Sequence, residues 1–312
     1  KFKNQDLTTR GVKMDFLTKA DLKEIVHKLK KLPFKVVLAI LFGSSTRRTL
    51  SRDSDIDILI ISDEIPPHRH RRQNEISLIK KLINIDRPLD ILLLTREECF
   101  SNFRNHNPLF LDIATEGKVL IAEDEFLEEL IEETKKYIHD QGIEKTENGW
   151  KFPIPYRKEA FLSQISNRQF AHAMLDDAKR DFEIGIIILE KEYFDKAVFH
   201  FQQSVEKSLK AVLIMMGVFV KSHFIGKALI KEIEEKQFPQ LWMNKLRHIA
   251  QLSTEIEPEV TWSRYPGIDN NSLWIPAEEY SREDAKNVKE KCQTILKTSQ
   301  EFYRWWFKEV QK

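Results

Sequence analysis

The sequence has few cysteines and no pattern among them. Only Cys99 and Cys292 occur in 312 residues, far apart and without the spacing of a metal site. Small secreted proteins are held together by several disulfides, and two distant cysteines cannot build such a framework. This cysteine usage suits a reducing compartment, so we expect a cytoplasmic protein.

Long apolar runs and an excess of one charge are also missing. No stretch approaches the roughly 20 apolar residues that span a bilayer. The first residues, Lys1 to Asn4, lack the apolar core of a signal peptide. Lys and Arg number 50, and Asp and Glu 49. We therefore expect no membrane partner and no overall field that attracts nucleic acid.

The most informative feature present is a pair of aspartates at the head of an apolar run. Residues 42–61 read FGSSTRRTLSRDSDIDILII, in which Gly43-Ser44 is followed after ten residues by Asp55. Side chains two apart on a strand point to the same face, so Asp55 and Asp57 can hold hard cations together while Ile56 packs on the other side. Such oxygen-only ligands suit Mg²⁺ rather than zinc.

A third carboxylate lies in another apolar run, Pro88 to Thr95. A single charge inside a strand is costly unless it pairs, so we expect Asp90 to face the first two aspartates. Three crowded carboxylates repel one another, and two divalent ions with a nucleoside triphosphate would relieve that repulsion. The arrangement indicates phosphoryl or nucleotidyl transfer. The alternative is an ordinary turn at Gly43-Ser44 with aspartates at a strand end, which leaves Asp90 unexplained.

Apolar periodicity divides the chain into two parts. In the first part we expect an α+β fold, a mixed sheet with flanking helices, with its site at strand ends. The expected strands are at about 35–42, 55–61, 89–94 and 118–121, and the expected helices at about 18–32, 70–85 and 124–140.

Residues 141–156 contain Gly, Asn and two prolines and break both periodicities, so we expect a linker there. The remainder has apolar residues at helical spacing and predicts an all-α, up-and-down bundle. We expect its helices at about 157–191, 194–216, 227–236, 239–254 and 285–306. The predicted domains are therefore 1–145 and 157–312.

The spacing from Gly43-Ser44 to Asp55-Ile56-Asp57, with the later Leu89-Asp90-Ile91, resembles the minimal nucleotidyltransferases of the DNA polymerase beta superfamily. The resemblance covers about residues 20–125. It implies that Asp55 and Asp57 bind two Mg²⁺ ions and that Asp90 completes the ion that activates the acceptor hydroxyl. It also implies that an NTP, with ATP favoured, is held by a loop in which Arg48 replaces the family's second Gly. The implied nucleotide contacts are Gly43, Ser44, Ser45 and Arg47.

The second part resembles the HEPN domain over about residues 158–310. The resemblance rests on the stretch 199–211, Ser222-His223, Ser263-Arg264-Tyr265-Pro266 and Tyr280-Ser281-Arg282. Active HEPN ribonucleases often carry an Arg, four to six residues and then a His, and this spacing is absent from the sequence. We therefore favour a substrate-holding or dimerising bundle over a nuclease. His223 and Arg264 match family positions and are candidates for an acceptor or second nucleotide site.

Two further groups have a functional and a structural interpretation. The basic run His68 to Arg72 could contact the phosphates of an acceptor, although such a run is more often a solvated helix face. The aromatic run Phe302 to Phe307 could stack on bases, but its helical spacing favours burial.

Together these features predict a two-domain, Mg²⁺-dependent nucleotidyltransferase. It would move a nucleoside monophosphate from an NTP to a hydroxyl on a small molecule, a protein or an RNA, with release of pyrophosphate. The competing hypothesis is a toxin–antitoxin-type or nucleotide-binding module whose transferase half is regulatory. The apolar faces of the long helices also predict a homodimer through the helical domain.

Overall fold

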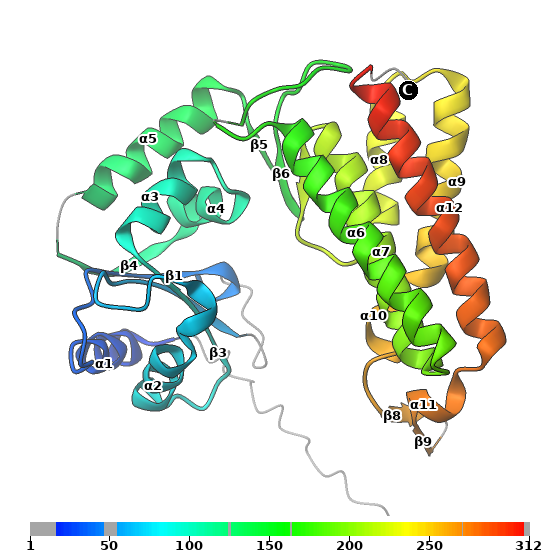
Figure 1. The fold of residues 1–312 in the computed structure, drawn as a ribbon. Helices are drawn as coiled ribbons and strands as arrows, with labels where there is room; N and C mark the ends of the chain where they lie inside the picture. The colour runs from blue at the N-terminus through cyan, green and yellow to red at the C-terminus, as the bar shows by residue number, and fades with distance from the viewer. Residues whose placement is uncertain (1–16, 47–54, 124–125, 163, 270, 309–312) are drawn as a thin grey trace, which may run out of the picture. The chain divides into compact units, whose positions relative to one another are not determined.

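The computed structural model describes residues 17–46, 55–123, 126–162, 164–269 and 271–308. The chain divides into two compact units, Lys1–Ile138 and His139–Lys312. Both units are drawn in Figure 1.

The first unit is built on a four-stranded sheet with the strand order β3-β2-β1-β4. Strands β2 and β3 are parallel, whereas β1 is antiparallel to both β2 and β4, so the sheet is mixed as predicted. Its strands are β1 (Leu38–Phe42), β2 (Ile56–Ile61), β3 (Leu89–Leu94) and β4 (Lys118–Ala122). Its helices are α1 (Lys19–Leu29), α2 (Gln73–Ile83), α3 (Arg96–Arg104), α4 (Pro108–Glu116) and α5 (Phe126–Asp140), with 3₁₀ turns η1 (Gly43–Thr46) and η2 (Arg69–Arg71).

Helices cover both faces of this sheet (Figure 1). Helices α1 and α2 place Ile25 and Ile79 against Ile58 of β2. Helices α3, α4 and α5 cover the opposite face, where Phe103 packs with Leu59. Successive side chains of a strand point to opposite faces, so the apolar residues of each strand are shared between two cores.

Local signals fix several helix starts. Thr18 forms the capping box that its spacing to Asp21 predicts, and Thr95 forms a second one with Glu98 at the start of α3. Helices α3 and α4 were not predicted from the sequence. The buried side chains of α3 are only Cys99 and Phe103, so its apolar pattern is weak.

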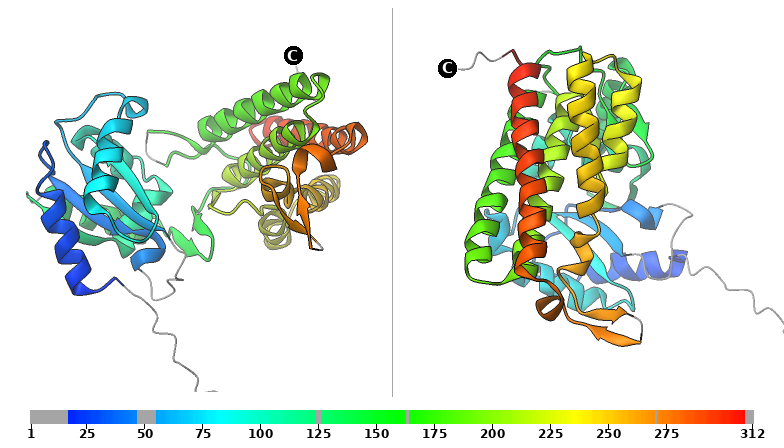
Figure 2. Two further views of the ribbon diagram at one scale, coloured as in Figure 1. Left: turned by 90° about the horizontal axis from the view of Figure 1, so that it is seen from below. Right: turned by 90° about the vertical axis from the view of Figure 1, so that its right-hand side faces the viewer.

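The second unit is mainly helical. Helix α7 packs against α6 and α12, α12 also contacts α9, and α8 packs on α9. Figure 2 shows the long helices side by side. The helices are α6 (Asn167–Glu190), α7 (Phe194–Met215), α8 (Gly226–Glu235), α9 (Gln240–Ile256), α10 (Glu259–Trp262), α11 (Pro276–Glu279) and α12 (Arg282–Trp306). The short strands are β5 (Glu144–Thr146), β6 (Gly149–Lys151), β7 (Val218–Val220), β8 (Gly267–Asp269) and β9 (Ser272–Trp274).

The segment expected to be a linker, 141–156, is instead part of this unit. Strands β5 and β6 lie within it, and β6 pairs with β7 in the antiparallel direction. A Cβ on Gly149 would lie 1.8 Å from the carbonyl oxygen of Phe219, so glycine permits this close approach of two backbones. The helix expected from residue 157 begins only at Asn167, after the capping residue Ser166.

The aromatic side chains of α12 serve the core. Phe302 and Trp306 are buried, and both cysteines are buried and free. This supports burial over base stacking for the run that ends the bundle. In the part of the chain that the structure describes, no helix combines the length and apolarity needed to cross a membrane.

Candidate active site

Asp57 and Asp90 occupy neighbouring positions on the parallel strands β2 and β3. They are direct partners in the register of the two strands. Adjacent strands lie about 4.8 Å apart, and side chains at paired positions share a face. The register therefore places these two residues side by side at the beginning of both strands, and the facing of Asp90 with both Asp55 and Asp57 stays a prediction.

The surroundings explain how the two charges are tolerated. On the same face, Leu59 and Leu92 pack in the core under α3, α4 and α5. The face is apolar where helices cover it and polar at its start, where Asp57 is half-buried and Asp90 exposed. The expectation that Asp90 is a costly charge inside a strand was wrong, because the strand begins in solvent.

The turn η1 lies directly against the Asp57 carboxylate. A Cβ on Gly43 would lie 2.2 Å from Oδ2 of Asp57, closer than real Cβ contacts come. Gly43 also has a φ of +71°, a left-handed conformation that glycine adopts without steric cost. The turn and the carboxylate can be neighbours only because residue 43 has no side chain.

Thr46 closes this turn and was not singled out from the sequence. Its hydroxyl donates to the carbonyl oxygen of Gly43 at 2.9 Å. A hydroxyl residue three positions after a turn glycine is the signal that could have identified it. Ser44 and Ser45 lie in η1 but their side chains are not described, and Arg47 lies outside the described residues.

The donor set suits a hard cation, although the structure shows no assembled metal site. Asp55 immediately precedes β2, so the three aspartates offer only carboxylate oxygens, the ligands that Mg²⁺ prefers. Among the described residues, no group of three or more His, Cys, Asp or Glu side chains is placed to hold a metal ion. Asp57 and Asp90 fit a metal by position and chemistry, and the three-carboxylate site stays a prediction.

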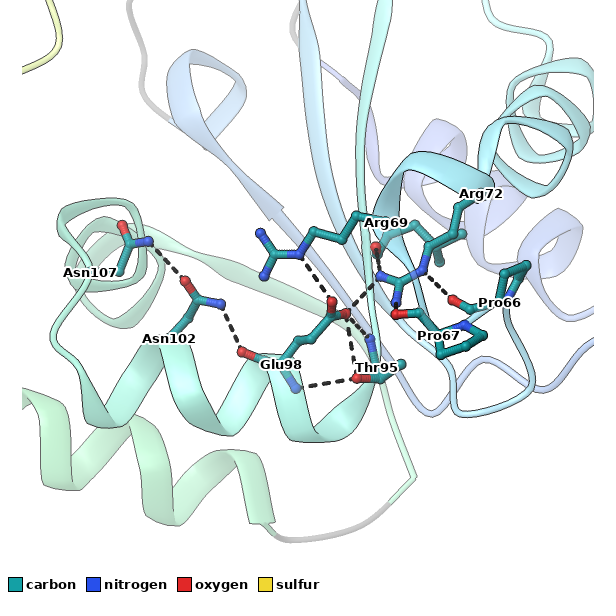
Figure 3. A network of polar contacts seen from close by, with 9 residues as sticks. Pro66, Pro67, Arg69, Arg72, Thr95, Glu98, Asn102 and Asn107 are labelled. Carbon is teal, nitrogen blue, oxygen red and sulfur yellow. Dashed lines mark hydrogen bonds and ion pairs between the residues drawn. The ribbon is translucent and has the colours of Figure 1, made fainter. Parts of the chain in front are cut away.

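The basic run His68 to Arg72 has a structural role in part, because Arg72 belongs to a network of polar contacts (Figure 3). Arg72 is buried and donates to the carbonyl oxygens of Pro66, Pro67 and Leu93. Its guanidinium also pairs with Glu98 at 2.6 Å. Leu93 is near the end of β3, whereas Asp90 is at its beginning, so this network is at the other end of the strands.

His223 lies beside a buried carboxylate in the helical unit. Its Nδ1 is 3.0 Å from Oε2 of Glu206 on α7, and Lys210 lies 2.8 Å from Oε1 of the same residue. Burial alone would raise the pKa of Glu206, but the hydrogen bonds from Lys210 and His223 outweigh it and lower that pKa. His223 thus extends from a charge-paired cluster, and its own side chain is exposed.

Arg264 lies against aromatic rings, whereas His223 lies beside a carboxylate. Its guanidinium lies 5.3 Å from the ring centre of Phe199 and 4.8 Å from that of Tyr265. Phe199 and Glu206 are seven residues apart on α7, which places them on one helix face about 10 Å apart. His223 and Arg264 therefore lie along the same face of α7. Their role in binding stays a prediction.

The first unit thus combines a mixed sheet, a register pair of aspartates and a Gly-Ser turn, and a helical unit follows it in the chain. Residues 23–126 match the family model "Polymerase beta, Nucleotidyltransferase", and residues 171–310 match the model "HEPN domain". The chain therefore contains a polymerase beta nucleotidyltransferase domain and a C-terminal HEPN domain. Both resemblances seen in the sequence are confirmed.

The chain is also similar to several individual proteins. The chain is 29% identical over 138 residues to "Putative toxin MJ1304" of Methanocaldococcus jannaschii, which covers 44% of this chain and 91% of that protein. Among solved structures it is similar to ST0689, an archaeal HEPN homologue, with 24% identity, 43% and 97% coverage of the two chains and a TM-score of 0.32. It is also similar to the spectinomycin adenyltransferase AAD(9) from Enterococcus faecialis, with 13% identity, 88% and 97% coverage and a TM-score of 0.35.

Proposed function

We propose that this protein is a Mg²⁺-dependent nucleotidyltransferase. It transfers a nucleoside monophosphate from an NTP, with ATP the expected donor, to a hydroxyl acceptor and releases pyrophosphate. The proposal rests on one observation: Asp57 and Asp90 occupy paired positions on β2 and β3, and the Gly43 turn lies against Asp57. The match to the nucleotidyltransferase family supports it.

The residues of the site have separate roles in this proposal. Asp55, Asp57 and Asp90 bind two Mg²⁺ ions, which when bound neutralise phosphate charge and lower the pKa of the acceptor hydroxyl. Gly43, Ser44, Ser45 and Arg47 hold the β- and γ-phosphates through the turn and its backbone N–H groups. Catalysis is then mainly positioning and electrostatic stabilisation, because little covalent chemistry is left to side chains.

Incubation with α-³²P-labelled NTPs, Mg²⁺ and a panel of acceptors tests the proposal. The acceptors should include aminoglycosides, the protein itself and RNA with a free 3′ hydroxyl. We expect label to transfer from the α-phosphate together with release of pyrophosphate. Label transfer from a γ-labelled NTP instead would show phosphoryl rather than nucleotidyl transfer and would overturn the proposal.

The close approach of Gly43 to Asp57 gives a first prediction. Gly43→Ala should lower transfer about 100-fold, because displacing a catalytic group by about 1 Å can cost that much. It should also destabilise the first unit by about 1–2 kcal/mol, the cost of a left-handed conformation in a residue with a Cβ. Transfer assays and thermal unfolding by circular dichroism measure the two effects.

Gly142→Ala is the matched control for this prediction. Gly142 has a similar φ of +62°, but a Cβ there would meet nothing within 4 Å. It should therefore carry the backbone strain without the loss of transfer. Equal loss of transfer in both variants would mean that the contact with Asp57 is unimportant.

A second prediction concerns the role of the helical unit in binding. We propose that this unit holds the acceptor or a second nucleotide through His223 and Arg264. Arg264→Ala should raise the KM for a phosphate-bearing ligand about tenfold, the loss of one charge-assisted contact, with thermal stability unchanged. Arg282→Ala is the control, since Arg282 also lies over a ring, that of Phe194. A loss of stability in step with activity would show that Arg264 is structural.

The third prediction is a homodimer through the helical unit. Ile184 and Ile187 of α6 are 41% and 58% exposed, and Phe170 of the same helix is 38% exposed. Phe170 stacks on Phe219 of the same unit, whereas Ile184 and Ile187 lie about 60° apart near the end of α6 and form a small exposed apolar patch. Ile187→Asp should give a monomer by light scattering at micromolar concentration. Leu241→Asp, at an exposed position of α9, should leave the dimer intact. A monomeric wild type would contradict the prediction.

A second candidate function is a toxin–antitoxin-type module whose transferase half is regulatory. The match to a protein named as a toxin favours it. The two functions differ in what Asp57→Asn does when the chain is expressed in cells. An effect on growth that survives this change would favour the regulatory module, and its loss would favour the transferase.

A further inference from the structure

The helical unit contains a pocket that the proposed transfer reaction does not use. It has a volume of about 310 Å³ and lies where α9, α10, α11 and α12 meet the hairpin of β8 and β9. Its walls combine aromatic rings with carboxylates. Neither His223 nor Arg264 lines it.

Three aromatic rings line this pocket. Trp262 and Trp274 lie with ring centres 5.4 Å apart at 81°, and Trp274 and Tyr280 lie 6.1 Å apart at 87°. The indole N–H of Trp274 donates to the carbonyl oxygen of Trp262 at 3.1 Å, and the Tyr280 hydroxyl donates to Glu259. The polar atoms of Trp274 and Tyr280 are thus engaged, and neighbouring rings are held nearly at right angles.

The pocket is strongly acidic. Four carboxylates line it, those of Glu255, Glu259, Glu279 and Asp284, against the single ammonium of Lys291. Lys291 pairs with Glu255 at 2.8 Å, and Asp284 accepts from the backbone of Ser281 at the start of α12. Within the described residues, the Glu279 side chain has neither a hydrogen bond nor an ion pair. The lining therefore has three more negative than positive groups.

The pKa of Glu259 agrees with a shortage of positive charge. Burial raises this pKa and the nearby Asp284 raises it further, while the hydrogen bond from Tyr280 opposes them without cancelling them. A carboxylate next to a cation would show the opposite direction.

We propose that this pocket binds a linear oligoamine, a methylene chain that carries two or more ammonium groups. The carboxylates pair with the ammonium groups, and the aromatic faces attract the charged nitrogen and its adjoining methylene groups through cation–π contacts. An inorganic dication gains little from aromatic walls. A nucleotide would be repelled, because its phosphates would meet the carboxylates. The site goes beyond the proposed transfer reaction and does not depend on it.

Isothermal titration of the full chain with spermidine tests this proposal. We expect saturable binding that weakens about tenfold in Trp262→Ala, since one cation–π contact in a partly desolvated site is worth about that factor. Trp262→Phe should restore most of it. Glu279→Gln should weaken binding several-fold, whereas Glu278→Gln, on the neighbouring position of α11 outside the pocket lining, should not change it.

Three outcomes would overturn the proposal. The first is the absence of saturable binding. The second is full displacement by Mg²⁺ at equal ionic strength with Trp262→Ala unaffected, which would show an ordinary acidic surface. The third is equally tight binding of 1,6-hexanediol, which would show that the charges are unimportant. Because the titration contains no NTP, these outcomes are independent of nucleotidyl transfer.

Discussion

Asp57→Asn is expected to lower nucleotidyl transfer on the order of 10³-fold while the first unit stays folded. The substitution keeps the shape of the side chain and removes its charge, and metal-based stabilisation of transferring phosphate is worth several kcal/mol. Asp57 is half-buried at the start of β2 and touches the Gly43 turn, so its amide would occupy the same space. Asp55→Asn should act in the same direction.

The measurement is α-phosphate transfer at saturating NTP, with Mg²⁺ titrated in each variant. Asp86→Asn is the matched control, because Asp86 is an exposed aspartate that precedes β3 by three residues. Circular dichroism reports whether each variant is folded. Transfer within a few-fold of the wild type in both Asp55→Asn and Asp57→Asn would show that these carboxylates are not the catalytic pair.

The strands around the site could be predicted from the sequence because their signals are local. β3 is predicted at 89–94 and lies at Leu89–Leu94, since Pro88 bounds one side of a short apolar run and Thr95 the other. The capping box of Thr18 likewise depends on residues three positions apart. Asp57 and Asp90 lie on the same face of the sheet because side chains alternate along a strand with a period of two and the two strands pair in parallel register.

Other parts of the fold depend on distant residues and could not be predicted. Strands β5 and β6 are only three residues long, and β7, the second partner of β6, is about 70 residues further along the chain. Helix α3 fully buries only Cys99 and Phe103, too few to define a helical period. The exposure of Asp90 was missed because the sequence does not show where the covering helices end.

The site itself was partly visible in the sequence. The residue types and spacing indicate carboxylate chemistry, but the contact between Gly43 and Asp57 depends on how the turn folds back onto β2. The basic run His68 to Arg72 could not be interpreted from the sequence alone. Arg69 and Arg72 have equal charge and similar sequence surroundings, yet Arg72 is buried and Arg69 is not. Only the tertiary structure distinguishes a structural arginine from a solvated one.

Arg72→Ala is expected to destabilise the first unit by about 3 kcal/mol, the lower end of the cost of removing one partner of a buried ion pair, because Glu98 is 23% exposed. The Arg72 side chain is 1% exposed and joins Pro66, Pro67 and Leu93 to Glu98 on α3. Its loss leaves carbonyl oxygens and a partly buried carboxylate without their donor. The wild-type network therefore holds the loop after β2 against the end of β3.

Arg69→Ala is the matched control, because Arg69 contacts the same Glu98 at 3.0 Å but is 57% exposed. An exposed pair contributes less than about 1 kcal/mol. All six tryptophans lie after residue 138. Tryptophan fluorescence therefore reports the second unit, and destabilisation of the first should appear as an earlier transition by circular dichroism alone.

The dependence on pH gives this prediction a second test. Burial raises the pKa of Glu98, but hydrogen bonds from Arg72, Thr95 and Arg69 outweigh it, so the net pKa is lowered. A carboxyl with a lowered pKa contributes stability above its unfolded value of about 4.3 and loses it as the pH falls. The gap in the free energy of unfolding between wild type and Arg72→Ala should therefore narrow as the pH falls below about 4. A gap that is constant with pH would mean that the lost carbonyl contacts, and not the pairing with Glu98, account for the destabilisation.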